Sequence, residues 1–263
     1  MSIATEGCNF RCVFCQNWSI SQSTKDRARR PSGETISPEE VVALSKSRGC
    51  RTISYTYTEP TIFFEYALET ASLASAQGIK NVFVTNGYMT PEALDVVYPH
   101  LHAANVDLKA FNDRTYRRLM GATLKPVLDS IRKMKSQGVW LEVTTLVIPT
   151  VNDSDGELRD IAEFIRSVGS EVPWHISRFH PDHHLRDLPA TPVKTLARAA
   201  EIGRETGLRY VYTGNVPGDA GEHTLCYFCG VHLIRRFGFQ VLENVLVNGC
   251  CPRCKSPIDG VWL

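Results

Sequence analysis

Runs of β-branched and aromatic residues recur about every 30 residues along the chain, and segments with helical spacing lie between them. These runs predict strands at residues 3–5, 52–58, 81–85, 104–108, 140–148, 174–179 and 210–213. Strands that alternate with helices form a parallel sheet with right-handed crossovers. A complete eightfold barrel needs about 250 residues for the barrel alone, and the last predicted strand here ends near residue 214. The sequence therefore predicts an α/β fold, an incomplete (β/α)6-type TIM-like barrel.

The predicted helices carry recognisable boundary signals. Residues Ser37 to Glu40 match a capping box with proline at the first helical position. The helices predicted at 62–77, 127–137 and 193–206 are each followed by a glycine, a common end signal. In folds of this kind the chemistry lies at the carboxyl ends of the strands, so the residues that end or follow each strand are the site candidates.

The composition narrows the function classes. Of 263 residues, 43% are hydrophobic and 22% charged, which is close to a soluble globular average. The longest apolar run is shorter than the roughly 18–20 residues of a membrane helix, and the first residues lack the pattern of a signal peptide. A net charge of +1 gives no electrostatic attraction to nucleic acid or anionic lipid. We expect a cytoplasmic protein with neither nucleic acid nor membrane as a partner.

Three of the nine cysteines follow the first predicted strand, as Cys8-x3-Cys12-x2-Cys15. Three nearby thiolates can hold three irons of a [4Fe-4S] cluster, whereas an electron carrier would ligate all four. The fourth iron is then open to the amino and carboxylate groups of S-adenosylmethionine. Electron transfer to the sulfonium would give a 5′-deoxyadenosyl radical, with the barrel supplying orientation and shielding. The alternative is a zinc site with three cysteines, or three unrelated thiols.

This triplet is the radical S-adenosylmethionine motif, and the sequence resembles that superfamily. Phe14 matches the aromatic residue that the superfamily often has before the third cysteine, and the resemblance implies that it contacts the cofactor. The segments GCNFRCVFCQNW, YTYTEPT and VDLKAF together resemble the AmmeMemoRadiSam-system radical enzymes, which are similar to pyruvate formate-lyase-activating enzymes. Two departures stand out. Thr-Glu-Pro replaces the usual Gly-Gly-Glu after the second strand, and the segment that usually precedes the cluster loop is missing, which suggests a truncated chain, a misassigned start or a short variant.

The resemblance implies roles for residues near the strand ends. Glu59 is expected to bind the ammonium group of the cofactor, the alternative being an acid at a helix N-terminus. Asn86 is expected to bond the cofactor or substrate, or to belong to an ordinary turn. Asp107 and Lys109 share one side of a strand and predict a polar site pair, or else a rim salt bridge. Thr144 is predicted to contact the ribose or carboxylate, or to be a half-buried core residue.

Other polar residues have simpler interpretations. His175 is interpreted as a satisfied core histidine, whereas Arg178 or His180 would lie nearer the mouth and contact substrate. A metal site at the three histidines 180, 183 and 184 is disfavoured, because no thiol or second carboxylate accompanies them. Cys50, alone before the second strand, is expected to be a small buried hydrophobic residue.

The C-terminal tail holds a second cysteine pattern. Cys226-x2-Cys229 and Cys251-x2-Cys254 flank a predicted hairpin over 233–247, which is typical of a zinc ribbon with four cysteine ligands. Structural zinc would supply folding energy to a module too small for a sufficient core. A second iron–sulfur cluster, or thiols that are empty or in disulfides, are the alternatives. The adjacent cysteine 250 could replace a ligand or stay free. We predict a domain boundary near residue 220, giving a barrel over 1–220 and a tail over 221–263.

These patterns together predict a radical S-adenosylmethionine enzyme that abstracts a hydrogen atom from a substrate that the sequence does not identify, such as a small metabolite. An activase acting on a protein glycine is the alternative that the resemblance implies. A non-catalytic metal-bound scaffold and a plain electron carrier are weaker hypotheses. The resemblance also implies a reductant such as flavodoxin or ferredoxin, and AMMECR-type and Memo-type proteins as partners.

Overall fold

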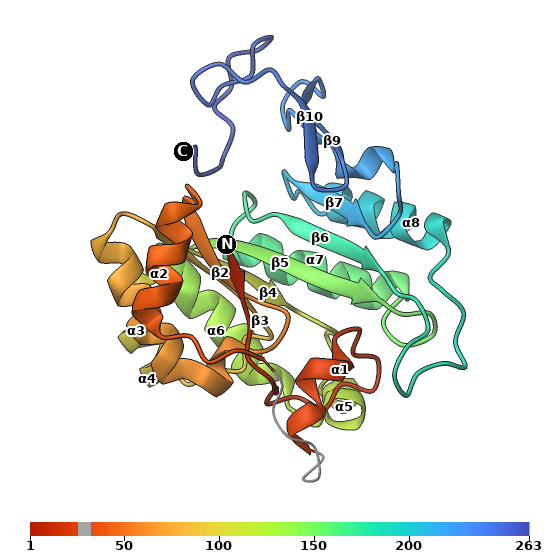
Figure 1. Cartoon of the computed structure of the whole chain (residues 1–263). Coiled ribbons are helices and arrows are strands. Elements are labelled where there is room, and N and C mark those ends of the chain that lie inside the picture. Colours follow the sequence, from red (N-terminus) through yellow and green to blue (C-terminus); the bar gives the residue numbers. More distant parts are fainter. Residues whose placement is uncertain (26–32, 263) are drawn as a thin grey trace. The chain divides into compact units, whose positions relative to one another are not determined.

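The computed structural model describes residues 1–25 and 33–262 (Figure 1). The chain divides into two compact units. Unit 1 consists of Met1–Leu108, Asn112–Leu141 and Asp182–Asp187, and unit 2 consists of Lys109–Phe111, Glu142–Pro181 and Leu188–Leu263. No helix in the described part of the chain is both long and apolar enough to cross a membrane.

Unit 1 contains four parallel strands that pair in sequence order. They are β1 (Ser2–Ile3), β2 (Thr52–Tyr55), β3 (Lys80–Thr85) and β4 (Ala103–Asp107). The helices of this unit are α1 (Trp18–Ser21), α2 (Pro38–Ser47), α3 (Phe64–Ala76), α4 (Pro91–Val97), α5 (Asp113–Thr115) and α6 (Leu124–Ser136). Short helical turns, mostly of the 3-10 type, lie at Ser23–Lys25, Pro60–Phe63, Tyr98–His100 and Tyr116–Met120.

Local signals explain where these helices begin. The predicted capping box of α2 is confirmed, because Ser37 accepts from the N–H of Glu40 while the Glu40 carboxylate accepts from the N–H of Ser37. Thr90 caps α4 through the N–H of Ala93. Asp113 accepts from the N–H of Leu124, the first residue of α6. These side chains satisfy N–H groups that a helix cannot pair internally.

The core of unit 1 joins its strands to α3. Tyr55 and Phe83 pack edge to face with ring centroids 5.2 Å apart, and both side chains are fully buried. Asn81 accepts from the Tyr55 hydroxyl and donates to the carbonyl of Ala71 in α3. The alternate residues of β2 and β3, such as Ser54, are half-buried on the other face. The strands thus present one closed, helix-covered face and one accessible face.

Unit 2 contains the parallel strands β5 (Trp140–Val147), whose first two residues belong to unit 1, β6 (Trp174–Arg178) and β7 (Val211–Gly214). Helices α7 (Asp155–Val168) and α8 (Val193–Glu205) also belong to it. Trp174 is fully buried, and its indole N–H donates to the Thr145 hydroxyl at 3.0 Å. After a 3-10 turn at Ala220–Glu222, the tail forms an antiparallel sheet of β8 (Thr224–Leu225), β9 (His232–Phe237) and β10 (Gln240–Asn244), in the order β10-β9-β8.

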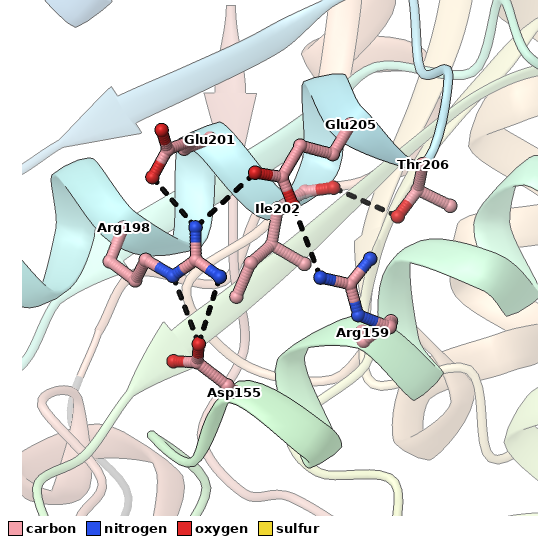
Figure 2. Close-up of polar contacts among 7 residues, drawn as sticks. All are labelled: Asp155, Arg159, Arg198, Glu201, Ile202, Glu205 and Thr206. Carbon is pink, nitrogen blue, oxygen red and sulfur yellow. Dashed lines mark hydrogen bonds and ion pairs between the residues drawn. The ribbon is translucent and has the colours of Figure 1, made fainter.

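A network of ion pairs connects α7 to α8 on the surface of unit 2 (Figure 2). Arg198 contacts Asp155 at 2.9 Å, Glu201 at 2.7 Å and Glu205 at 3.4 Å. Arg159 contacts Glu205 at 3.1 Å. Because these side chains are partly or largely exposed to water, each pair adds little to stability, and the network connects α8 to α7 rather than holding the fold together.

The predicted α/β class and the parallel pairing of the strands are confirmed within both units. Each predicted strand is present, although the first lies at Ser2–Ile3 rather than at 3–5. The predicted tail hairpin is β9–β10. The domain boundary near residue 220 stays a prediction.

Candidate active site

The cysteine loop follows β1 and is held by backbone contacts to a segment about 100 residues away in sequence. The N–H groups of Arg11 and Val13 donate to the carbonyls of Met120 and Leu119, at 2.8 and 3.0 Å. Phe10 and Phe14 are buried, so the structure places Phe14, a predicted cofactor contact, among the residues that anchor the loop. These contacts hold a loop that has almost no regular structure of its own.

Two of the three loop thiols, those of Cys8 and Cys15, lie beside polar groups. Cys8 Sγ accepts from the N–H of Phe10 at 3.4 Å and from the Asn86 side-chain amide at 3.7 Å. Cys15 Sγ lies 3.2 Å from the Ser21 hydroxyl, and Cys12 is 7% exposed. No disulfide involves any of the nine cysteines, all of which lie in the described residues. Thiolates that accept hydrogen bonds are suited to an iron–sulfur cluster, whose potential depends on such bonds.

Glu59 is a buried carboxylate a few residues beyond β2. Its side chain accepts from the Thr61 N–H and hydroxyl at 3.1 and 2.6 Å, from the Thr85 hydroxyl at 2.7 Å and from the Asn86 N–H at 2.8 Å. The bond from the Thr61 N–H caps the turn Pro60–Phe63, so the alternative role as a helix-terminal acid is present too. Among the described residues, no Lys, Arg or His pairs with it.

Burial raises the pKa of the Glu59 carboxyl, while the hydrogen bonds from Thr61, Asn86 and Thr85 act in the opposite direction. Glu59 is 2% exposed, and its carboxylate has hydrogen-bond donors around it but no cationic partner among the residues that the structure describes. A ligand with an ammonium group would supply that missing charge and favour the ionised form. The structure therefore offers the type of acceptor that the amino group of S-adenosylmethionine requires.

Asn86 joins Glu59 to the cysteine loop. Its backbone N–H donates to Glu59, while its side-chain amide donates to Asn9 Oδ1 at 2.6 Å and faces Cys8 Sγ. The turn continues through Gly87, with φ of +71°, where an added Cβ would lie 2.7 Å from a methyl carbon of Val106. The structure thus brings three predicted site residues, Cys8, Glu59 and Asn86, into one hydrogen-bonded chain.

Sequence reasoning missed the residues that hold this chain together. Asn9 accepts from Asn86 and donates to the carbonyl of Tyr88, and two threonines, Thr61 and Thr85, donate to Glu59. Asn9 lies inside the cysteine motif, so the motif itself was a signal. Thr85 ends β3 and Thr61 lies in the turn Pro60–Phe63 directly after Glu59, where a buried acid needs donors.

The remaining predicted cofactor residues lie outside this chain of hydrogen bonds. Asp107 ends β4, and Asp107 and Lys109 are half-buried on either side of the fully buried Leu108, as expected for residues that alternate along a strand. Lys109 belongs to unit 2, where its carbonyl accepts from Asn152 at 2.8 Å. Thr144 also belongs to unit 2 and is half-buried in β5, in register with His175 of β6.

Two simpler interpretations were wrong. His175 is not a core histidine, because its side chain is 34% exposed, bonds to Glu142 Oε2 at 2.6 Å and stacks on Tyr212. It lies on the half-exposed face of the unit 2 strands, opposite the face that carries Trp174. Cys50 is half-buried rather than buried, because it lies in the connection between α2 and β2 instead of in a strand.

A further segment of unit 1 contacts the cysteine loop. The N–H of His184 donates to the Val13 carbonyl at 2.9 Å. The indole N–H of Trp18 donates to Asp182 at 3.0 Å, and its ring stacks on His183 with centroids 5.3 Å apart. This contact spans more than 160 residues of sequence, which is why local patterns did not reveal it.

The four tail cysteines form a group of possible metal ligands in unit 2. The sulfur atoms of Cys226, Cys229, Cys251 and Cys254 all lie within 4.8 Å of one another. This group could bind a metal ion, as the spacing of the two Cys-x2-Cys turns predicted.

Three cysteines follow the first strand of a parallel α/β fold and lie beside a buried acid. Three thiolates leave one iron of a [4Fe-4S] cluster without a protein ligand, which is typical of an enzyme that uses the cluster for catalysis. The profile described as "Radical SAM superfamily" matches residues 2–165, and the chain belongs to that superfamily. The chain is therefore an enzyme of the radical S-adenosylmethionine class, whose cofactors are a [4Fe-4S] cluster and S-adenosylmethionine.

The chain is also similar to individual proteins and to solved structures. An uncharacterized protein of Methanocaldococcus jannaschii is 43% identical over 262 residues, covering 98% of this chain and 77% of the relative. The pyruvate formate-lyase-activating enzyme of Clostridium pasteurianum is 22% identical over 204 residues, covering 70% and 82%. Among solved structures, a radical SAM methyltransferase from Sphaerobacter thermophilus aligns with a TM-score of 0.63 at 16% identity, over 84% of this chain and 69% of that chain. The AmmeMemoRadiSam subtype stays a prediction.

Proposed function

We propose that this enzyme binds its cluster through Cys8, Cys12 and Cys15 and binds the amino group of S-adenosylmethionine at Glu59. The observation that carries the proposal is the chain of hydrogen bonds from Cys8 through Asn86 to Glu59. It links a candidate cluster ligand to a buried carboxylate that lacks a cationic partner among the described residues.

When bound, the cluster and cofactor would supply the radical chemistry, which is reductive cleavage of S-adenosylmethionine followed by hydrogen-atom abstraction from the substrate. Glu59 holds the ammonium group by charge and by its fixed position. Asn86 donates to the Cys8 sulfur and keeps the loop aligned with Glu59. The buried rings of Phe10 and Phe14 exclude water from one side of the loop.

We further propose that a reductant such as flavodoxin or ferredoxin supplies the electron. An activase role on a protein glycine rests on the names of relatives, and no contact in the described residues favours it. The scaffold hypothesis is not retained, because the chain belongs to a superfamily of enzymes. AMMECR-type and Memo-type partners stay predictions.

The test is the formation of 5′-deoxyadenosine by anaerobically reconstituted protein given a strong reductant and S-adenosylmethionine. We expect product from the unmodified protein and none from Cys12→Ala. Cys50→Ala is the matched control, because it removes a cysteine outside both cysteine groups and should retain activity. Equal product from Cys12→Ala, or no product from protein whose cluster is visible by electron paramagnetic resonance, would contradict the proposal.

A further inference from the structure

The four tail cysteines are arranged for one shared ion. Cys226 Sγ lies 3.5 Å from Cys254 Sγ, and Cys229 Sγ lies 3.7 Å from Cys251 Sγ. A tetrahedral zinc ion with Zn–S bonds of about 2.3 Å places neighbouring sulfurs about 3.8 Å apart. In an iron–sulfur cluster the four thiolates are divided among two or four irons, so they do not all stand as close together as four ligands of one ion, whereas here all four sulfurs lie within 4.8 Å of one another. The sulfur positions therefore fit a single ion and not a second cluster.

The two Cys-x2-Cys turns have the same backbone geometry. In the first, the Gly230 N–H donates to the Cys226 carbonyl at 2.9 Å, and the Cys226 N–H donates to the Val231 carbonyl at 2.9 Å. In the second, the Lys255 N–H donates to the Cys251 carbonyl at 3.0 Å, and the Cys251 N–H donates to the Ser256 carbonyl at 2.9 Å. Two equivalent turns that face each other present four thiols to one point.

One of these turns contains an unfavourable backbone conformation. Gly230 and Lys255 occupy the same place in the two turns, and both have left-handed φ values, of +72° and +64°. Glycine adopts this conformation freely, whereas a lysine does so at a cost. Such a residue persists where the surrounding structure determines its conformation, and a metal ion held by Cys251 and Cys254 would do this.

The site is also the centre of a very small core. Cys226 and Cys251 are 2% and 0% exposed, and they are packed with Leu233, Ile234 and Ile258. This core is too small to stabilise the tail by apolar burial alone. A metal ion held by four thiolates would add its binding free energy to the folding of this segment.

The same core includes the residue that leads into β7. Tyr210 is buried in it, its hydroxyl donates to the Asp259 carboxylate at 3.0 Å, and the Asp259 N–H donates to that hydroxyl at 2.9 Å. Arg209 pairs with Asp259 at 2.8 Å, and its guanidinium lies 4.6 Å from the ring centroid of Tyr227, inside the first turn. The Tyr210 carbonyl accepts from the Trp174 N–H of β6. The cysteine turns are thus attached directly to the start of the last parallel strand.

We propose that Cys226, Cys229, Cys251 and Cys254 bind a single zinc ion that attaches the C-terminal segment to the start of β7. Four protein ligands leave no open position, so the site is structural rather than catalytic. Zinc is favoured over ferrous iron because thiolate sites bind Zn²⁺ more tightly in the divalent series. This proposal is independent of the reaction at the cysteine loop.

The test uses the full-length chain with Cys8, Cys12 and Cys15 all replaced by serine, which removes the proposed cluster from the metal analysis. We expect about one zinc ion per chain and no inorganic sulfide. Replacement of zinc by cobalt(II) should give the intense thiolate-to-cobalt absorption of a tetrahedral site. Cys254→Ser should lose the ion, whereas the matched variant Cys250→Ser should retain it. If Cys254→Ser does not fold, Cys254→His should still bind cobalt with a shifted spectrum.

Hydrogen–deuterium exchange then tests the attachment. Removal of zinc by a chelator should abolish protection in β9 and around Tyr210 and Asp259, while β2 and β3 keep theirs. Iron accompanied by inorganic sulfide would overturn the proposal, as would zinc content unaffected by Cys254→Ser or metal-free protein with four reactive tail thiols. Unchanged exchange after zinc loss would overturn the structural role.

Discussion

Replacement of Glu59 by glutamine tests the proposed cofactor contact most directly, because the side chain keeps its shape and loses its charge. The carboxylate accepts all four of its hydrogen bonds, so the new amide group would face donors where the carboxylate oxygens now accept. A hydrogen bond to a charged group contributes about 1.5–3 kcal/mol, which corresponds to a roughly 10- to 150-fold loss of affinity for S-adenosylmethionine.

The measurement is equilibrium dialysis of labelled S-adenosylmethionine against anaerobically reconstituted Glu59→Gln. Glu65→Gln is the matched control, because Glu65 is an exposed acid in the first turn of the neighbouring helix and should leave the affinity unchanged. Cluster content is determined in both variants, so that loss of the cluster is not mistaken for loss of the contact. Affinity of Glu59→Gln within about twofold of the unmodified protein would refute the reasoning.

Glu59→Gln should also change how the free energy of unfolding depends on pH. Because burial raises the pKa of Glu59 above its ordinary value of 4.5, the folded protein without cofactor holds this proton more tightly than the unfolded chain does. The contribution of Glu59 to stability is therefore complete below the ordinary pKa and is lost as pH rises through the raised pKa. Glu59→Gln should remove this decline. Urea unfolding measured at pH values from below the ordinary pKa upward gives the free energy of unfolding of both proteins. An identical decline with pH in the variant would contradict the raised pKa of Glu59.

Three further substitutions have defined outcomes. Asn86→Asp removes the amide donor to Cys8, so the midpoint potential of the cluster should fall. A redox titration followed by electron paramagnetic resonance measures this potential, and an unchanged value would contradict the contact. Gly87→Ala forces a left-handed φ of +71° on alanine and brings its Cβ to 2.7 Å from Val106, so urea unfolding should show a loss of about 1–3 kcal/mol. Lys255→Gly removes the cost of a left-handed φ of +64° for a residue with a side chain, so it should raise the free energy of unfolding by about 0.5–1 kcal/mol. The gain should be seen as a higher Tm, whereas a lower Tm would show that the lysine side chain is needed.

The strands could be predicted because their composition and period are local properties of the sequence. The extent of the first two strands could not, because each is limited by the residues with which it pairs. The first strand is limited to Ser2–Ile3, which pair with Ser54 and Tyr55 of β2. Conversely, the capping box at Ser37 is complete within four residues of sequence, so the sequence alone located the start of α2.

The candidate cysteine ligands and Glu59 could be predicted because motifs place them at fixed spacings after strands. Their supporting residues depend on the folded structure. Thr61 and Thr85 are ordinary residues in sequence and become specific only because both hydroxyls donate to one buried carboxylate. His175 was misread for a related reason, since its place on the half-exposed face of β6 depends on the register of that strand with β5.

The turn after β3 has a wider role than its length suggests. Asn86 contacts the candidate cofactor acid through its backbone and the candidate cluster ligand through its side chain, so one peptide position aligns both. Gly87 allows no side chain there, because Val106 fills the space. A displacement of this turn would therefore shift the Glu59 contact and the Cys8 contact together, and cofactor affinity and cluster potential should change in parallel across substitutions in the turn. Substitutions at Ser21, whose hydroxyl contacts the Cys15 sulfur, should change the potential and leave the affinity unaltered.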